Sequence, residues 1–89
     1  MRAVITVIGR DQVGIIAGIS NILANCNINI LDISQTIMQD VFTMIMLTDV
    51  SNATVVFNAL LDTLETKGSE LGVYVKIQHE DIFNSMHRI

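Results

Sequence analysis

Residues 28–49 read Ile-Asn-Ile-Leu-Asp-Ile-Ser-Gln-Thr-Ile-Met-Gln-Asp-Val-Phe-Thr-Met-Ile-Met-Leu-Thr-Asp and contain two strand patterns in succession. β-Branched and other apolar residues favour one strand over residues 28–38 and a second over residues 41–49. Only Gln39 and Asp40 separate them, which is the length of a tight hairpin turn, although the pair lacks the glycine of the commonest turns. The stretch therefore predicts an antiparallel hairpin in the middle of the chain.

A strand and a helix are predicted before this hairpin. Residues 2–9 are rich in β-branched residues and end at Gly9, and residues 10–14 form a polar connection. The following helix is expected to end near Asn25–Asn27, because asparagine tolerates the left-handed conformation that closes helices. Its apolar residues recur at three- and four-residue spacing, namely Ile15, Ile16, Ile19, Ile22, Leu23 and Cys26.

A helix and a strand are also predicted after the hairpin. Ser51 or Asn52 can cap this second helix, and Lys67-Gly68 supplies a stop. Its apolar stripe is Val56, Phe57, Leu60, Leu61 and Leu64. Residues 71–78 alternate as a strand does, and residues 80–89 form a short amphipathic helix through Ile82, Phe83, Met86 and Ile89.

The predicted order is therefore β-α-β-β-α-β with a short tail helix. The simplest packing is an α+β ferredoxin-like sandwich, in which two helices cover one face of a four-stranded antiparallel sheet. A chain of 89 residues has the length of one domain, so we expect a single domain over residues 1–89.

The second face of this sheet is expected to be covered. A sheet with one wet face alternates apolar and polar residues, but strand 41–49 is apolar on both faces. Simple alternation in strand 28–38 puts Ile28 and Ile30 on one face and Leu31, Ile33 and Ile37 on the other. Exposed apolar patches usually mark interfaces, so the tail helix or a second copy should cover them, and we expect a homo-oligomer.

Composition and charge exclude several classes of protein. With 51% hydrophobic and 16% charged residues, the chain is not a disordered segment, and no apolar run reaches the roughly 18 residues of a membrane span. The start lacks the features of a signal peptide, and the single Cys26 cannot form an internal disulfide, so we expect a cytoplasmic protein. Five scattered Lys/Arg against nine Asp/Glu argue against binding nucleic acid or an anionic membrane.

No catalytic or metal motif is complete. Gly9 and Gly14 have the spacing of a phosphate-binding loop, but Ile15-Ile16 stand where Lys and Ser/Thr are required. His79-Glu80 begins like a zinc-binding H-E-x-x-H motif, but Phe83 occupies the second histidine position. Residues 9–14 also resemble the phosphate loop of acylphosphatases, without the arginine that follows it in those enzymes. We expect neither an enzyme, a metal site nor a cofactor.

The polar connection 10–14 leads directly into a helix N-terminus. Free backbone N–H groups there attract a carboxylate, and Asp11 could meet an ammonium group. Together they would recognise the two charged ends of a free α-amino acid. An alternative reading is that Asp11 only caps the helix and Gly14 only permits the turn.

Three stretches together resemble the ACT domain family, whose small βαββαβ modules bind amino acids and regulate metabolism. They are residues 7–19 (Val-Ile-Gly-Arg-Asp-Gln-Val-Gly-Ile-Ile-Ala-Gly-Ile), residues 27–36 (Asn-Ile-Asn-Ile-Leu-Asp-Ile-Ser-Gln-Thr) and residues 42–46 (Phe-Thr-Met-Ile-Met). More narrowly, the chain resembles small standalone bacterial ACT proteins and the ACT modules of the glycine-cleavage transcriptional repressor group. The likeness extends over nearly the whole chain.

The resemblance implies a homodimer with an effector bound between subunits. The ligand-binding positions that it marks are Asp11, Gln12, Val13, Gly14, Ile15 and Ile16 after the first strand, and Asn29, Ile30 and Leu31 in the second. Asn29 would bond the ligand carboxylate or carbonyl. Asp32, Ser34 and Gln35 belong to the subgroup signature, either as ligand contacts or as a polar seam at the sheet edge.

Two functions follow as expectations. The first is a regulatory module that binds a small molecule, an amino acid, as a homodimer. Because ACT domains usually regulate an attached domain and none is expected in this chain, the module would act in trans, sense a ligand for an unknown partner, or have another role. The second is a protein-interaction subunit that has no small ligand.

Overall fold

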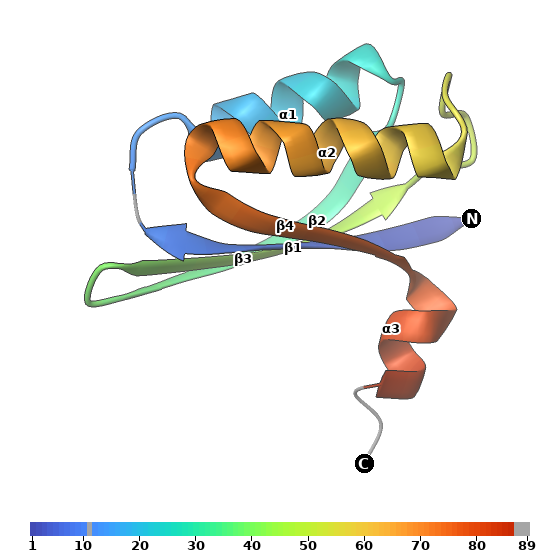
Figure 1. The fold of residues 1–89 in the computed structure, drawn as a ribbon. Helices are drawn as coiled ribbons and strands as arrows, with labels where there is room; N and C mark the ends of the chain where they lie inside the picture. The colour runs from blue at the N-terminus through green and yellow to red at the C-terminus, as the bar shows by residue number, and fades with distance from the viewer. Residues whose placement is uncertain (11, 87–89) are drawn as a thin grey trace.

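Two helices cover one face of a four-stranded antiparallel sheet, and a third helix leaves the sheet on the opposite face (Figure 1). The computed structural model describes residues 1–10 and 12–86. Its elements are β1 (Arg2–Arg10), α1 (Ile15–Asn25), β2 (Asn29–Met38), β3 (Val41–Asp49), α2 (Phe57–Leu71), β4 (Val73–His79) and α3 (Glu80–Met86). The predicted ferredoxin-like fold with its extra C-terminal helix is confirmed, although Ile89 of the predicted tail lies outside the described residues.

The strand order is β2-β3-β1-β4, so β2 and β4 form the two edges of the sheet. The predicted hairpin between β2 and β3 is present, with Gln39 in the left-handed conformation at φ 57°. The predicted left-handed residue after α1 is Asn27, at φ 59°. Both sites use a polar residue where glycine is the usual solution.

The core lies between the sheet and the two long helices. Inward-facing residues of β1 and β3, such as Ile5 and Met46, pack against α1 residues such as Ile19 and α2 residues such as Leu64, and all four are fully buried. Thr48 is the buried polar residue of this layer, and its Oγ1 donates a hydrogen bond of 2.8 Å to the carbonyl of Ala3. A buried hydroxyl with a partner avoids the cost of an unsatisfied polar group.

The predicted start and the predicted end of the second helix are both wrong, because α2 runs from Phe57 to Leu71. Ser51 lies in the preceding turn, where its N–H donates to Asp49 Oδ1, and the helix starts at Phe57 after the exposed Val56. At the other end, Gly68 does not stop the helix but lies buried within it, and Gly72 at φ 74° ends it. A Cβ at Gly68 would lie 2.7 Å from Val75 Cγ2, so this glycine allows α2 to approach β4 closely.

The face assignment predicted for β2 is also wrong, because the strand contains a bulge. Ile30 pairs with Thr48, but Asp32 pairs with Leu47 and Ile33 with Met46, so the register shifts between Ile30 and Asp32. One extra residue reverses the alternation, which puts Ile33 and Ile37 on the same face as Ile30. Asp32 Oδ1 accepts a hydrogen bond of 2.9 Å from Ile33 N next to the bulge.

The face opposite α1 and α2 is called the lower face here. It carries Val4, Thr6 and Ile8 from β1, Thr43, Ile45 and Leu47 from β3, Asp32, Ser34 and Thr36 from β2, and Tyr74, Lys76 and Gln78 from β4. α3 contacts this sheet at β1 and β4, and Glu80 pairs with Arg2 through two contacts of 2.8 and 3.0 Å. Ile8, Ile45 and Tyr74 stay exposed, so the sequence correctly indicated apolar residues on both faces of β3.

Within residues 1–10 and 12–86, no helix is long and apolar enough to cross a membrane.

Candidate functional site

The first half of the predicted site lies at the N-terminus of α1. Gly14 is the N-cap at φ 96°, and among the described residues no side chain caps this helix. The bond from Gly18 N to Gly14 O, at 2.9 Å, is the helix-type bond that reaches back to the cap. The N–H groups of the first helical turn are therefore available to an anion such as a carboxylate.

The side chains of this loop divide into anchoring and exposed ones. Gln12 Nε2 donates to the carbonyl of Leu71, which ties the loop to the end of α2. Ile15 is buried and anchors α1, so only its backbone can reach a ligand. Val13 is fully exposed and Ile16 is 40% exposed, so both present apolar surface beside the free N–H groups. Asp11 lies outside the described residues, and both of its predicted roles stay predictions.

The second half of the predicted site lies at the start of β2, beside a polar pocket. This pocket of about 350 Å³ is lined by Ala24, Asn27, Ile28, Asn29, Asp49 and Asn52. Asn29 is exposed, Ile30 is half-buried and Leu31 is 45% exposed next to the bulge. Three amides and one carboxylate give the pocket both hydrogen-bond donors and acceptors.

Asp49 is the charged group of this pocket. Its Oδ1 accepts a hydrogen bond of 2.9 Å from Ser51 N and lies 3.9 Å from the N-terminal ammonium. The hydrogen bonds from Ser51, helped by the N-terminal charge and Arg2, hold the pKa of Asp49 below its ordinary value. Asn27 Nδ2 donates to the carbonyl of Asn52 at 3.0 Å and closes one side of the pocket.

The sequence pattern alone does not identify Asp49, Asn27 and Asn52 as neighbours of Asn29. The pairing of Asn29 with Asp49 depends on the hairpin register, which the bulge shifts by one residue. Counting back from the Gln39-Asp40 turn without the bulge gives the wrong partner. The predicted hairpin turn therefore locates the pairing of β2 with β3, but it does not by itself give the pairing partner of Asn29.

One chain does not bring the two halves together. Asn29 pairs with Asp49, which pairs with Arg2 at the start of β1. The Gly14 loop instead follows Arg10 at the other end of β1. A strand of nine residues spans about 30 Å, so the halves lie at opposite ends of the sheet.

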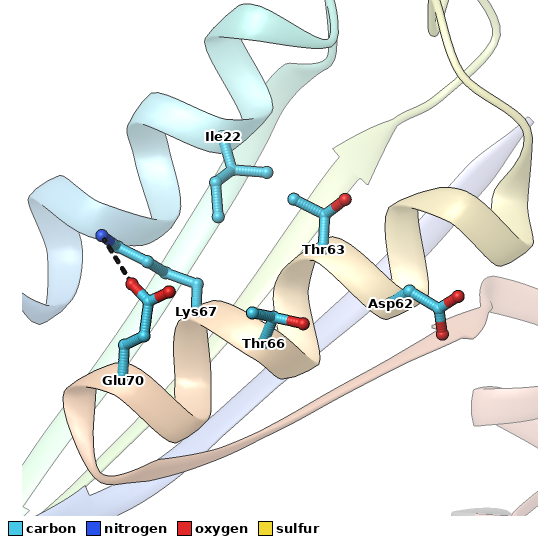
Figure 2. Close-up of a pocket in the computed structure, with 6 residues that line it drawn as sticks. All are labelled: Ile22, Asp62, Thr63, Thr66, Lys67 and Glu70. Atoms are coloured by element: carbon cyan, nitrogen blue, oxygen red, sulfur yellow. Dashed lines mark ion pairs between the residues drawn. The ribbon is translucent and has the colours of Figure 1, made fainter.

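A further groove of about 410 Å³ lies on the outer side of the helices (Figure 2). It is lined by Ile22 of α1 and by Asp62, Thr63, Thr66, Lys67 and Glu70 of α2. Lys67 Nζ lies 3.6 Å from Glu70 Oε1, and Thr63 Oγ1 donates to Ala59 O, so these polar groups already have partners. Among the residues that the structure describes, no three His, Cys, Asp or Glu side chains gather as a metal site.

The chain is similar in sequence to proteins of other organisms and in structure to solved proteins. A UPF0237 protein of Clostridium acetobutylicum is 64% identical over 89 residues, with both chains covered in full. One from Methanocaldococcus jannaschii is 62% identical and covers 99% of this chain and 98% of the relative. A solved ACT domain protein from Streptococcus pneumoniae has a TM-score of 0.81 at 41% identity, with 93% of each chain covered.

Two larger solved structures contain the same fold. The regulatory subunit of aspartate kinase from Thermus thermophilus matches with a TM-score of 0.66 at 26% identity, over 86% of this chain and 50% of that one. A protein described as a glycine cleavage system transcriptional repressor matches with a TM-score of 0.71 at 24% identity, over 86% and 44%. The profile of the ACT domain matches residues 2–78, and this chain therefore belongs to the ACT domain family of regulatory ligand-binding modules.

Proposed function

We propose that this chain is a regulatory module that binds an amino acid as a homodimer, with the ligand between subunits beside the Gly14 loop. The observation that carries the proposal is the separation of the two half-sites at opposite ends of one sheet. A ligand that contacts both halves requires a second chain. The family membership and the likeness to a regulatory subunit of aspartate kinase support the regulatory role.

The exposed edge strand β2 supplies a way to unite the halves. Met38 at the end of β2 pairs with Val41, which pairs with Arg10, so this end of β2 lies at the same end of the sheet as the Gly14 loop. If two β2 edges pair in antiparallel fashion, Asn29 of one chain comes to the Met38 end of its partner. The polar pocket of one chain then approaches the helix N-terminus of the other.

The apolar residues beside this edge favour the same arrangement. Ile33 and Ile37 are 41% and 54% exposed on the helix-facing side of β2, beyond the cover of the two helices. Pairing of two β2 edges would bury them together with Ile16 of α1. Exposed apolar groups beside an open strand edge are typical of association surfaces.

In this arrangement each half recognises a different part of the ligand. The N–H groups after Gly14 bind the carboxylate, and Asp11 binds the ammonium group. Asn29, Ile30 and Leu31 of the partner surround the side chain and remaining polar atoms. Binding then favours one arrangement of the two subunits, which a regulated protein in the cytoplasm can sense.

The first test is a thermal-shift screen of the purified protein against the twenty protein amino acids. A ligand at one hundred times its Kd adds about 2.7 kcal/mol to the free energy of unfolding, which raises the Tm of a small domain by several degrees. Asp11→Ala should abolish the shift, whereas the matched variant Asp40→Ala, in the β2–β3 turn, should keep it. Full retention of the shift in Asp11→Ala would contradict the assignment of the ammonium site.

Subunit mixing tests whether the site is shared. Homodimers of Asp11→Ala and homodimers of Asn29→Ala should each fail to bind in calorimetry. Refolding the two variants together should restore binding, because a mixed dimer has one site with both residues intact. If mixing restores nothing while the wild type binds, the two residues do not face each other across an interface.

The lower face is the observation that favours the second candidate, a protein-interaction subunit without a small ligand. Tyr74 is 60% exposed there, together with Ile8 and Ile45. If no amino acid shifts the Tm, and a stable partner is recovered whose binding no amino acid changes, this second function replaces the first.

A further inference from the structure

The edge strand β4 is regular and open along its outer side. It pairs with β1 without a register shift, from Val73 opposite Gly9 to His79 opposite Ala3, and within the described residues no strand pairs with it on the other side. In an antiparallel strand every second residue directs its N–H and C=O away from the neighbouring strand. β4 therefore offers a row of free backbone donors and acceptors, whereas the opposite edge, β2, is interrupted by its bulge.

A groove follows this edge between β4 and α2. It has a volume of about 530 Å³ and is lined by Leu61, Glu65 and Ser69 of α2 and by residues 73–77 of β4. The side chains of β4 that face the helices, such as Val75, are buried, so α2 covers the sheet as far as its last strand. A further strand beside β4 would therefore have one face against α2 and one face level with the lower face.

The spacing of the groove residues on α2 matches the spacing of a strand. Leu61, Glu65 and Ser69 follow one another at four-residue intervals, which is a rise of about 6.0 Å along a helix. Side chains on one face of a strand recur every two residues, or about 6.6 Å. α2 and β4 run in opposite directions from the turn at Gly72, so Ser69 lies toward the start of β4 and Leu61 toward its end (Figure 1). Successive helix-facing side chains of an extended peptide would therefore meet these three residues in turn.

The charges of the groove lie on its two sides. Glu65 is exposed on α2, Lys76 is half-buried on the lower-face side of β4, and neither forms an ion pair among the described residues. A residue opposite Val75 in an added strand would point toward Glu65, and the preceding residue would lie directly opposite Lys76. Opposite charges in directly facing cross-strand positions are stabilising, so the groove favours a basic residue at the first position and an acidic residue at the second.

We propose that the β4 edge binds an extended peptide segment of another protein as a fifth, antiparallel strand. Along the peptide, an apolar residue beside Leu61 is followed by an acidic residue opposite Lys76 and a basic residue beside Glu65. Backbone hydrogen bonds supply the affinity, and the alternating side chains supply the specificity. The peptide lies at the edge of the sheet opposite to β2, so its binding does not depend on an amino-acid ligand.

The same charges disfavour a second copy of this chain at the β4 edge. Lys76 is the middle residue of β4, so antiparallel pairing of two β4 strands about their middle places two lysines directly opposite each other. It also brings the two Glu65 carboxylates to the same stretch of the interface. Like charges in facing positions are destabilising, whereas a peptide of the stated pattern pairs with both groups.

The test uses the fluorescein-labelled peptide Ser-Thr-Leu-Glu-Arg-Val-Thr, titrated with the full chain and followed by fluorescence anisotropy. The matched peptide Ser-Thr-Leu-Arg-Glu-Val-Thr has the same composition and should bind about tenfold more weakly, because both charge pairs become like-charged. The double variant Glu65→Lys and Lys76→Glu should reverse this preference. Asp62→Lys is the control on α2, because Asp62 lines the outer groove, and it should keep the wild-type preference.

Hydrogen exchange of the full chain locates the bound peptide. Binding should slow exchange of the β4 N–H groups that point away from β1 and leave those of β2 unchanged. N-methylation of one alternate set of peptide residues should abolish binding, and methylation of the other set should preserve it, because only every second N–H pairs with β4.

Three outcomes would overturn the proposal. In the first, the two peptides bind the wild type equally, or neither binds at millimolar concentration. In the second, the double variant, shown to be folded by circular dichroism, keeps the wild-type preference. In the third, the outward N–H groups of β4 become protected in the free protein as its concentration rises, which would mean that a second copy occupies the edge.

Discussion

Replacement of Gly68 by alanine should destabilise the protein, although alanine is the better helix former. In an open helix the change gains roughly 0.8–1 kcal/mol. At Gly68 the new Cβ would lie 2.7 Å from Val75 Cγ2 and 2.9 Å from the carbonyl oxygen of Val73. The second contact is with the backbone of β4, so α2 must move away from the sheet to relieve it.

Overpacking of this kind typically costs 1–3 kcal/mol, and a contact with backbone belongs near the upper value. Subtracting the helix-propensity gain leaves a net loss of about 1–2 kcal/mol in the free energy of unfolding. For a domain of this size such a loss lowers Tm by roughly 4–16 °C. The measurement is thermal and urea unfolding at one fixed protein concentration, because association contributes to apparent stability.

Gly18 provides the matched control within the same structure. A Cβ there would lie 3.1 Å from Leu71 Cδ1 and from Lys67 Cε, which are the far ends of flexible side chains. These ends can shift by a few tenths of an ångström, so Gly18→Ala should be neutral or up to about 1 kcal/mol more stable. If Gly68→Ala is as stable as the wild type, or if the two variants lose equal stability, close packing of α2 on β4 does not explain the buried glycine.

Three further changes test the loop, the core and the pocket. Gly14→Ala should lose about 1 kcal/mol through left-handed strain alone, since none of the described residues places an atom within 4 Å of the new Cβ, and Gly14→Asn should lose less in the same urea titration. Thr48→Val should lose about 1 kcal/mol in thermal unfolding, because it removes the hydrogen bond to Ala3 O at nearly constant volume. Asp49 has a lowered pKa, so its contribution to stability is present above its ordinary pKa of 3.8 and is lost as the pH falls through the folded-state value. The Tm difference between the wild type and Asp49→Asn should therefore shrink on acidification, and a difference that is constant down to the acid limit would contradict this assignment.

The order of elements could be predicted because the strands and helices differ strongly in their apolar spacing. The hairpin around Gln39-Asp40 and the left-handed Asn27 followed from local sequence. The end of the second helix was predicted wrongly because a glycine can either end a helix or allow it to pack closely against a neighbouring element. Gly68 serves packing against β4 and Gly72 serves the helix end, and only the neighbouring strand distinguishes them.

The bulge in β2 limited what could be predicted of the candidate site. A strict alternation gives no sign of an extra residue between Ile30 and Asp32, yet this residue decides the face of Ile33 and the partner of Asn29. Asp32 stabilises the local geometry by accepting a hydrogen bond from Ile33 N, which gives this signature residue a structural role at the sheet edge. Such a long-range consequence of one local irregularity appears only when the paired strand is known.

The bulge also decides on which face of the sheet the apolar residues of β2 lie. It turns Ile33 and Ile37 toward the helix-facing side of β2, so the exposed apolar residues of the β2 edge lie on one side of the sheet. The lower face then receives Asp32, Ser34 and Thr36 from β2, and its apolar centre is confined to β1, β3 and Tyr74 of β4. The β2 edge and the lower face therefore use separate sets of apolar residues. Substitution of Ile33 and Ile37 can test the proposed subunit contact at this edge without altering the apolar residues of the lower face.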